Sequence, residues 1–355
     1  MDEVRDELVR TAERLCAGGV NPAVLREAEA GGWPELLWQA VAAAGLTAAL
    51  VPEDAGGAGL TAPDAMSLVR VAAAHAAPVP LAETMLAGWL LARAGLKIPE
   101  GRPLGIAPVR PHDRFEIAAA SGGFRLTGTA SRIPWARSVT ALAVLADGAD
   151  GVHVARLPAG SFAIAPARNV AGEPRDGIAV DAVLPADAVA RAPLGLDAGS
   201  VQAVGAVVRT NQIAGALERA LALTVGYART RIQFGQPIGK FQAIQHNLAV
   251  FAGHAAAATA AAEMAAEAFD AGLDPVIVGA AKARAGEAAS IAAGFAHQIH
   301  GAIGFTEEFA LHPLTRRLWS WRDEFGNEAF WHARVGKAAF AAGADGLWPM
   351  ITLAS

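Results

Sequence analysis

The stretch that decides the fold is Arg231–His246, which reads RIQFGQPIGKFQAIQH. Its residue types suit contact with a phosphorylated and aromatic ligand. The guanidinium of Arg231 offers a planar fork of donors to phosphate oxygens, and Phe234 can cover an apolar or aromatic surface. An arginine just before a helix can also be solvated or salt-bridged, so neither residue defines a site by itself.

A second informative stretch, Gln298–Glu308, reads QIHGAIGFTEE. Glycine at position 301 lets a backbone amide approach a ligand closely. The same glycine, with Gly304, could equally end a helix that finishes near His300. His297 and His300 have the i, i+3 spacing of a metal pair, but no third ligand is evident, so we predict no metal site.

Working outward from these stretches, the chain divides into three regions. Helical spacing of apolar residues predicts a helical domain at 1–101 and a second at 194–355. Between them, short apolar runs separated by Gly and Asp predict a β domain at 102–193. The expected strands are Phe115–Ala118, Phe124–Thr127, Thr140–Leu145, Val152–Leu157 and Ile178–Val183.

Composition limits the function classes. The chain has 355 residues, of which 53% are hydrophobic, and a mean hydropathy of +0.32. Much of this excess is alanine, and no purely apolar run of about 18 residues occurs, so we expect no membrane insertion. The charged N-terminus lacks the pattern of a secretory signal, which favours the cytoplasm. A net charge of −5 without a basic block argues against a nucleic-acid partner. The single Cys16 cannot form an intrachain disulfide.

Both stretches, in this order of domains, closely resemble the signature segments of the acyl-CoA dehydrogenase family. The resemblance implies an α+β fold with an N-terminal helical domain, a middle β-barrel or sandwich domain and a C-terminal four-helix bundle. It also implies FAD as the cofactor. In that family, the matching residues reach across a subunit interface to the adenosine and pyrophosphate of a flavin held mainly by the neighbour. Here they are Arg231, Gln233, Phe234, Gln298 and Gly301.

The residue that acts as the base in the family is missing. Members abstract the substrate's α-proton with a glutamate in a Tyr-Glu-Gly-Thr segment. In this chain Gly326 matches the glycine, but Phe325 stands at the glutamate position, and phenylalanine cannot accept a proton. Asp323 and Glu324 precede it and are substitute candidates. Some relatives take the base from the glutamate of a Leu-Asp-x-Glu-Arg segment instead. Here the matching segment, Leu196–Ser200, reads LDAGS, so that glutamate is absent as well.

The segments that meet the flavin ring in the family also differ. The Thr-Glu-Pro-x-x-Gly-Ser-Asp segment, which supplies hydroxyls and backbone amides, is replaced by Pro103–His112, which reads PLGIAPVRPH. The Trp-Ile-Thr that lies against the flavin is replaced by Arg132-Ile133-Pro134, and Pro134 lacks both a hydroxyl and an amide hydrogen.

The surviving positions are those that the family uses across the interface, and the lost ones serve the subunit's own flavin. We therefore expect an α2β2 heterotetramer in which this chain completes the flavin site of a catalytic partner. The resemblance implies dehydrogenation of an acyl-CoA thioester, in fatty acid or steroid side-chain degradation, with electron-transfer flavoprotein as acceptor. One alternative is a self-sufficient homo-oligomer with Glu324 or Asp323 as base. Another is a non-enzymatic member that binds acyl-CoA or protein.

Overall fold

The computed structural model describes residues 2–352. The chain folds into two compact units, which we describe separately. The first contains the residues up to Leu68 together with Pro78–Gly205, and the second contains Val69–Ala77 and the residues from Ala206 onward. The N-terminal helices and the strands therefore share one unit, and the three-domain division stays a prediction.

Local signals set the N-terminal helices of the first unit. Asn21 caps α2, because its side-chain oxygen accepts from the amides of Ala23 and Val24 at 2.9 and 3.1 Å. Gly31, with φ of 106°, ends the same helix in the left-handed region. The five helices are α1 (Asp2–Gly19), α2 (Pro22–Ala30), α3 (Glu35–Ala43), α4 (Ala62–Ala74), whose last residues belong to the second unit, and α5 (Leu81–Arg93).

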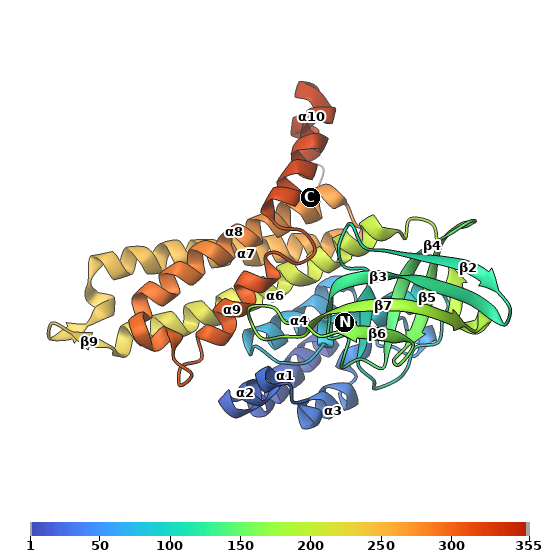
Figure 1. Ribbon diagram of the computed structural model, residues 1–355. Coiled ribbons are helices and arrows are strands. Elements are labelled where there is room, and N and C mark those ends of the chain that lie inside the picture. The colour runs from blue at the N-terminus through green and yellow to red at the C-terminus, as the bar shows by residue number, and fades with distance from the viewer. Residues whose placement is uncertain (1, 353–355) are drawn as a thin grey trace. The chain divides into compact units, whose positions relative to one another are not determined.

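The strands of the first unit form one eight-stranded mixed sheet (Figure 1). The order β6-β7-β3-β2-β4-β5-β8 places β6 and β8 at its ends, while β1 pairs in parallel with β4. Helix α5 packs against β1, β4 and β5 and is buried along most of its length. The strands are β1 (Leu104–Ala107), β2 (Arg114–Ala120), β3 (Gly123–Pro134), β4 (Ala141–Gly148), β5 (Gly151–Pro158), β6 (Phe162–Ala165), β7 (Arg175–Leu184) and β8 (Val189–Arg191).

The second unit is a bundle of long helices that pack closely through small residues. Trp331 is fully buried, and its ring lies where Gly279 leaves room; a Cβ there would be 2.7 Å from the ring. Asn211 joins two helices by donating to the carbonyl of Ala262 at 3.3 Å. The elements are α6 (Ala198–Thr230), which begins in the first unit, β9 (Ile232–Gln233), β10 (Gln236–Pro237), α7 (Gln242–Asp270), α8 (Pro275–His300), α9 (His312–Trp321) and α10 (Glu328–Thr352).

Among residues 2–352, α7 is the one helix long and apolar enough to cross a membrane by length and composition. A third of its most apolar window, 33%, is buried in the structure, and core helices of soluble proteins pass the same test. It runs beside α8 and packs against it along the bundle (Figure 1). Its apolar character is therefore accounted for in part by bundle packing.

Candidate functional site

The first signature stretch forms a hairpin at the end of the bundle (Figure 1). β9 and β10 pair antiparallel with Gln233 opposite Gln236, so Phe234 and Gly235 form the two-residue turn. Both have positive φ, 50° and 79°. Such a turn suits glycine, whereas phenylalanine rarely adopts this conformation. Phe234 is also 92% exposed, so this strained aromatic side chain is accessible to a ligand or partner.

The polar residues of the hairpin face solvent. Arg231 and Gln233 are both exposed, and the Gln233 side chain donates to the neighbouring carbonyl of Ile232, at 2.8 Å. Arg231 follows the last turn of α6, where its amide donates to the carbonyl of Tyr227 at 2.8 Å. The helix end therefore fixes the backbone while the guanidinium remains accessible.

The second signature stretch ends α8 beside the hairpin. Gly301 is the C-cap residue, with φ of 64°, and its amide donates to the carbonyl of His297. The structure therefore confirms that this glycine ends the helix. Apart from its two chain neighbours, no atom of residues 2–352 lies within 4 Å of the position a Cβ would occupy, so a ligand could approach this backbone. Gln298, one turn earlier, is exposed.

A small apolar cluster joins the two stretches. Ile238 follows the hairpin and packs with Ala228 of α6 and Ile299 of α8. Tyr227, Phe241, Ile244 and Leu248 pack against this cluster. Since Ile299 lies between Gln298 and His300, the cluster places the polar residues of both stretches at the same end of the bundle.

The two histidines of the second stretch are buried and aromatic-stacked. His297 stacks on Phe305 at 4.1 Å between ring centroids, and its Nε2 lies 2.8 Å from the Thr315 hydroxyl. His300 stacks on Tyr227 at 4.6 Å. Burial lowers the pKa of both histidines from the usual value, which favours neutral rings. Within residues 2–352 no group of three or more His, Cys, Asp and Glu side chains could hold a metal ion.

Position 325, where the sequence predicts the family's base to fall, holds a buried aromatic ring. Phe325 is 5% exposed and has a positive φ of 54°. The guanidinium of Arg209 from α6 lies over this ring, 5.4 Å from its centroid. The indole nitrogen of Trp331 donates to the Phe325 carbonyl at 3.0 Å. Position 325 is thus an integral part of the packing between helices.

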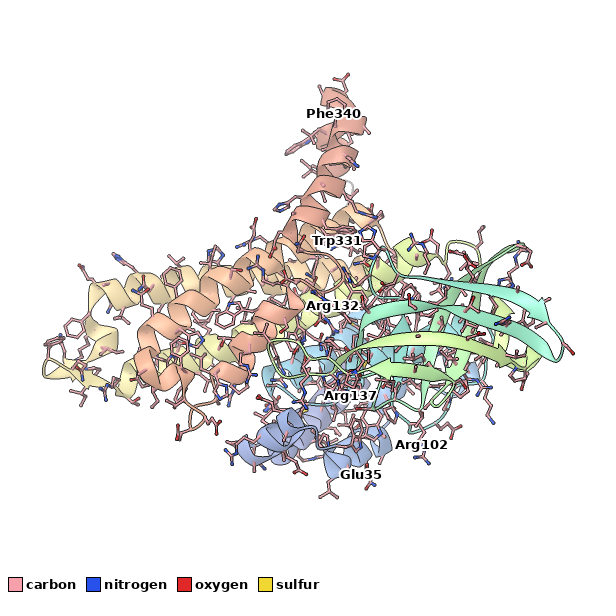
Figure 2. The ribbon with its side chains drawn as sticks, in the orientation of Figure 1. Glu35, Arg102, Arg132, Arg137, Trp331 and Phe340 are labelled. Carbon is pink, nitrogen blue, oxygen red and sulfur yellow. The ribbon has the colours of Figure 1, made fainter. Side chains whose placement is uncertain are left out.

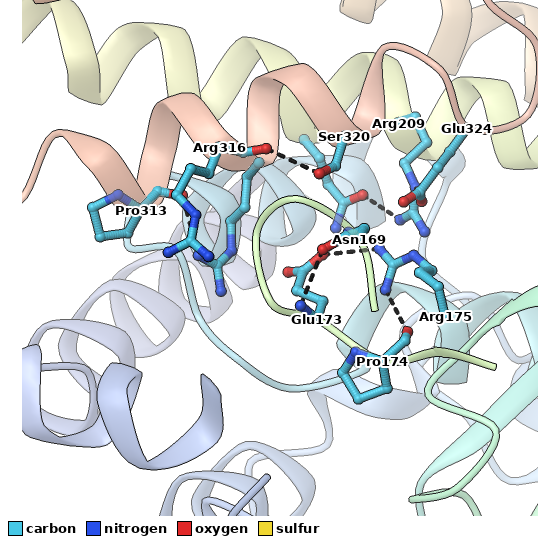
Figure 3. Close-up of polar contacts among 11 residues, drawn as sticks. Asn169, Glu173, Pro174, Arg175, Arg209, Pro313, Arg316, Ser320 and Glu324 are labelled. Atoms are coloured by element: carbon cyan, nitrogen blue, oxygen red, sulfur yellow. Dashed lines mark hydrogen bonds and ion pairs between the residues drawn. The ribbon is translucent and has the colours of Figure 1, made fainter. Parts of the chain in front are cut away.

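The substitute carboxylates are not equivalent. Glu324 accepts a hydrogen bond from Arg209 Nε at 2.7 Å, and its side chain is 16% exposed (Figure 3). Arg209 itself is 1% exposed, so Glu324 neutralises a buried cation. The side chain of Asp323 is 59% exposed and lies 4.0 Å from Arg322. The adjacent residues therefore face different environments, as neighbours on a turn normally do.

A buried lysine binds the backbone of the same turn. Lys282 of α8 is 1% exposed, and its Nζ donates to the carbonyls of Arg322 at 2.7 Å and Gly326 at 2.9 Å. Burial lowers its pKa to about 7, opposed first by the charge of Glu328. Neither Lys282 nor Arg209 could be identified from a motif, because both lie inside helices with no marked pattern around them. A charged residue within an alanine-rich helix was the only available signal.

The remaining predicted segments lie elsewhere. Asp197 and Ser200, within the LDAGS segment, cap the start of α6, since the amide of Ser200 donates to Asp197 Oδ1 at 2.8 Å. Pro134 is buried at the end of β3 and supplies no donor.

The exposed donors at 231, 233 and 298, with the bare backbone at 301, fit one side of a flavin dinucleotide. The segment at 132–134 does not fit the ring contacts.

Comparison with known proteins identifies the family. The acyl-CoA dehydrogenase N-terminal domain matches residues 2–97, and the acyl-CoA dehydrogenase C-terminal domain matches residues 203–339. The chain therefore belongs to the acyl-CoA dehydrogenase family, a family of acyl-CoA oxidoreductases. The predicted family and fold class are confirmed.

Individual relatives cover nearly the whole chain. The acyl-CoA dehydrogenase IpdE2 of Mycobacterium tuberculosis is 31% identical over 332 residues, which are 89% of this chain and 91% of the relative. Among solved structures, a steroid ACAD named Tcur3481-Tcur3483 has a TM-score of 0.86 at 26% identity, covering 96% of this chain and 99% of that one. Butyryl-CoA dehydrogenase from Megasphaera elsdenii has a TM-score of 0.84 over 96% and 99% of the two chains, and at 20% identity it shows the fold.

Proposed function

We propose that this chain is the site-completing subunit of an FAD-dependent acyl-CoA dehydrogenase. The single observation that carries the proposal is Phe325, buried under Arg209 at the position of the family's base. A buried phenyl ring cannot take the substrate's α-proton, so a second chain must supply that group. We expect that partner to be another acyl-CoA dehydrogenase-like subunit, in an α2β2 assembly.

The chain's contribution would come from the exposed end of the bundle. Arg231 would donate to pyrophosphate oxygens, Gln233 and Gln298 would donate to polar edges of the dinucleotide, and Phe234 would cover its aromatic part. The open backbone at Gly301 would allow close approach. When bound, FAD supplies the acceptor for the hydride that leaves the substrate's β-carbon.

The relatives support the substrate class. IpdE2 is named an acyl-CoA dehydrogenase, and the 26% identical structure is named as a steroid ACAD with a paired designation. We therefore propose α,β-dehydrogenation of an acyl-CoA thioester from lipid or steroid side-chain degradation. We also propose that electron-transfer flavoprotein accepts the electrons and that the protein is cytoplasmic.

The test is the FAD-to-protein ratio of the chain expressed alone and together with an acyl-CoA dehydrogenase-like product of a neighbouring gene. We expect a colourless lone chain, and a yellow complex with one FAD per pair of chains. Stoichiometric FAD on the lone chain, with oxidation of an acyl-CoA, would refute the heteromeric role. Complexes without flavin would instead favour a non-enzymatic binding role.

A matched pair of variants tests the contact surface. Phe234→Ala removes an exposed ring from the hairpin, and Phe340→Ala removes one that is 90% exposed on α10 (Figure 2). We expect F234A to lower the FAD content of the complex and F340A to leave it unchanged.

Glu324→Gln tests the self-sufficient alternative. We expect this variant to leave turnover by the complex unaffected at a temperature where the variant is folded.

A further inference from the structure

We propose that His297 and His300 are positioning residues of the loop at 301–311, and that this loop is released when their imidazole rings take up protons. The loop begins at Gly301, whose open backbone belongs to the surface assigned to the dinucleotide above. Only the consequence of release, the loss of FAD, rests on the proposed function, because the histidines hold the loop within the lone chain.

The hydrogen bonds within the loop are short-range. The amide of Thr306 donates to the carbonyl of Ile303 at 3.2 Å, and the amide of Phe309 donates to the carbonyl of Thr306 at 3.3 Å. These bonds shape the loop but do not join it to a helix. Most of the loop is exposed to solvent. Side-chain contacts therefore decide how firmly it lies on the bundle.

Two aromatic side chains of the loop rest on the two histidines of α8. Phe305 stacks on His297, with ring centroids 4.1 Å apart and an interplanar angle of 21°. Phe309 contacts His300 with ring centroids 4.7 Å apart, and Tyr227 of α6 stacks on the same histidine at 4.6 Å. Aromatic pairs at these separations stabilise a contact beyond the burial of their surface. His300 thus joins the loop to α6 as well as to α8.

The hydrogen bonding of His300 favours a neutral ring. Its Nδ1 lies 2.8 Å from the carbonyl oxygen of Ala296, which only accepts, so Nδ1 carries the hydrogen. Its Nε2 is buried and has no hydrogen-bond partner among residues 2–352. A second proton would sit on Nε2 as a charged donor without an acceptor, on a residue that is 4% exposed.

His297 is constrained in the same way. Its Nε2 lies 2.8 Å from the Thr315 hydroxyl of α9, and Trp319 of the same helix stacks on its ring at 5.7 Å. Its Nδ1 is buried without a partner in the described part of the chain. This nitrogen faces Gly304 of the loop, since a Cβ added there would lie 3.3 Å from it. A protonated ring would therefore direct an unpaired N–H towards the loop.

The surrounding charges do not favour an imidazolium at either position. Burial is the main cause that lowers the pKa of both histidines, and His300 and His312 lower the pKa of His297 further. The bond to the Ala296 carbonyl opposes the effect at His300. Charged or titratable side chains on the elements packed around the rings include Glu307, Glu308, Arg229, His246, His312, Arg316 and Arg317. Cations outnumber carboxylates in this set.

The test is hydrogen exchange of the lone chain, followed in peptides covering 301–311 from pH 7 to pH 5 and corrected for the intrinsic pH dependence of exchange. A histidine that is neutral in the closed loop and titrates near 6.5 in the open one raises the opening equilibrium by up to about tenfold per pH unit. We expect exchange of the loop to rise accordingly below pH 6.5, while peptides covering 255–268 of α7 stay protected.

Matched variants separate positioning from a purely structural role. His300→Phe keeps an aromatic ring beside Tyr227 and Phe309 but cannot take up a proton, so it should reduce the steepness of the pH dependence by about half. Adding His297→Phe should abolish the pH dependence. His300→Ala removes the ring and should open the loop already at pH 7. His332→Gln replaces an exposed histidine of α10 and should keep the parent's pH profile.

Two results would overturn the positioning role. One is loop exchange that does not change between pH 7 and pH 5 in the parent chain, a measurement that needs no variant to fold. The other is a pH dependence in H297F/H300F equal to that of the parent.

The FAD content of the complex at the same pH values tests the consequence. We expect the parent and H332Q complexes to lose FAD below pH 6.5 and the H297F/H300F complex to retain it. Loop opening without any loss of FAD would overturn the link between loop and cofactor. Because the exchange experiment uses the lone chain, a complex that never binds FAD would refute the proposed function and leave the positioning role in place.

Discussion

Replacing Lys282 by methionine tests how the turn that contains Phe325 is held. Methionine has a similar length but no donor, so the carbonyls of Arg322 and Gly326 lose their partner inside the protein. Each buried acceptor left without a hydrogen bond costs about 1–3 kcal/mol. With two such carbonyls, we therefore expect K282M to lower the free energy of unfolding by about 2–6 kcal/mol at pH 9.

The loss should depend on pH in a defined direction. The pKa of Lys282 falls from 10.5 to about 7 on folding, so between these values the unfolded chain binds more protons than the native one. Stability of the parent then rises with pH in this window, by up to about 1.4 kcal/mol per pH unit, and K282M lacks that contribution. The difference between parent and variant should therefore grow from pH 7 towards pH 10.

Urea unfolding at several pH values, followed by circular dichroism, measures this difference. Lys337→Met, which removes an exposed lysine from α10 of the same unit, is the control and should track the parent at each pH. Hydrogen exchange of peptides covering 322–331 locates the effect. A stability difference that stays constant or shrinks as pH rises would refute the assignment of a neutral, carbonyl-bound amine at position 282.

Three further predictions concern the second unit. Glu324→Gln should destabilise the chain by about 3 kcal/mol in thermal or urea unfolding, because buried Arg209 loses the carboxylate charge that lies 2.7 Å from its Nε, whereas Asp323→Asn at the exposed neighbour should have little effect. Phe234→Gly should raise the free energy of unfolding of the lone chain by about 1 kcal/mol, since glycine tolerates φ of 50°. The buried neutral His297 has a folded pKa below 6.5, so stability should fall as pH drops through 6.5, and His297→Gln should flatten this acid limb in unfolding measurements from pH 7 to 5.

Much of the fold was predictable because its signals are local and repeated. The five expected strands all lie within strands of the sheet, apart from Thr140, and glycine or aspartate turns bound most of them. The strands β1, β6 and β8 escaped prediction because they have only three or four residues each. Such lengths give too little alternation for a period-two pattern, and their pairing is set by distant partners.

The site was predictable only where a motif marks it. The motifs located the exposed hairpin and the end of α8, which the apolar cluster around Ile238 brings together. The apolar spacing of Ile291 and Ile299 also suggests one covered face of α8, yet Ile291 is 42% exposed. Periodicity identifies a helix, but the partner helices decide which side of an alanine-rich helix is covered.

The packing around Phe325 bears on whether position 325 could hold a catalytic base in this fold. A glutamate at this position would stand beside the Arg209 guanidinium, which lies over the present ring. A nearby cation stabilises a carboxylate and lowers its pKa, which makes it a weaker base. Phe325→Glu alone should therefore not create an effective base, because Arg209 already pairs with Glu324 and would attract the new carboxylate as well. Whether a carboxylate at position 325 could act as a base therefore depends on Arg209 of α6 as well as on position 325 itself.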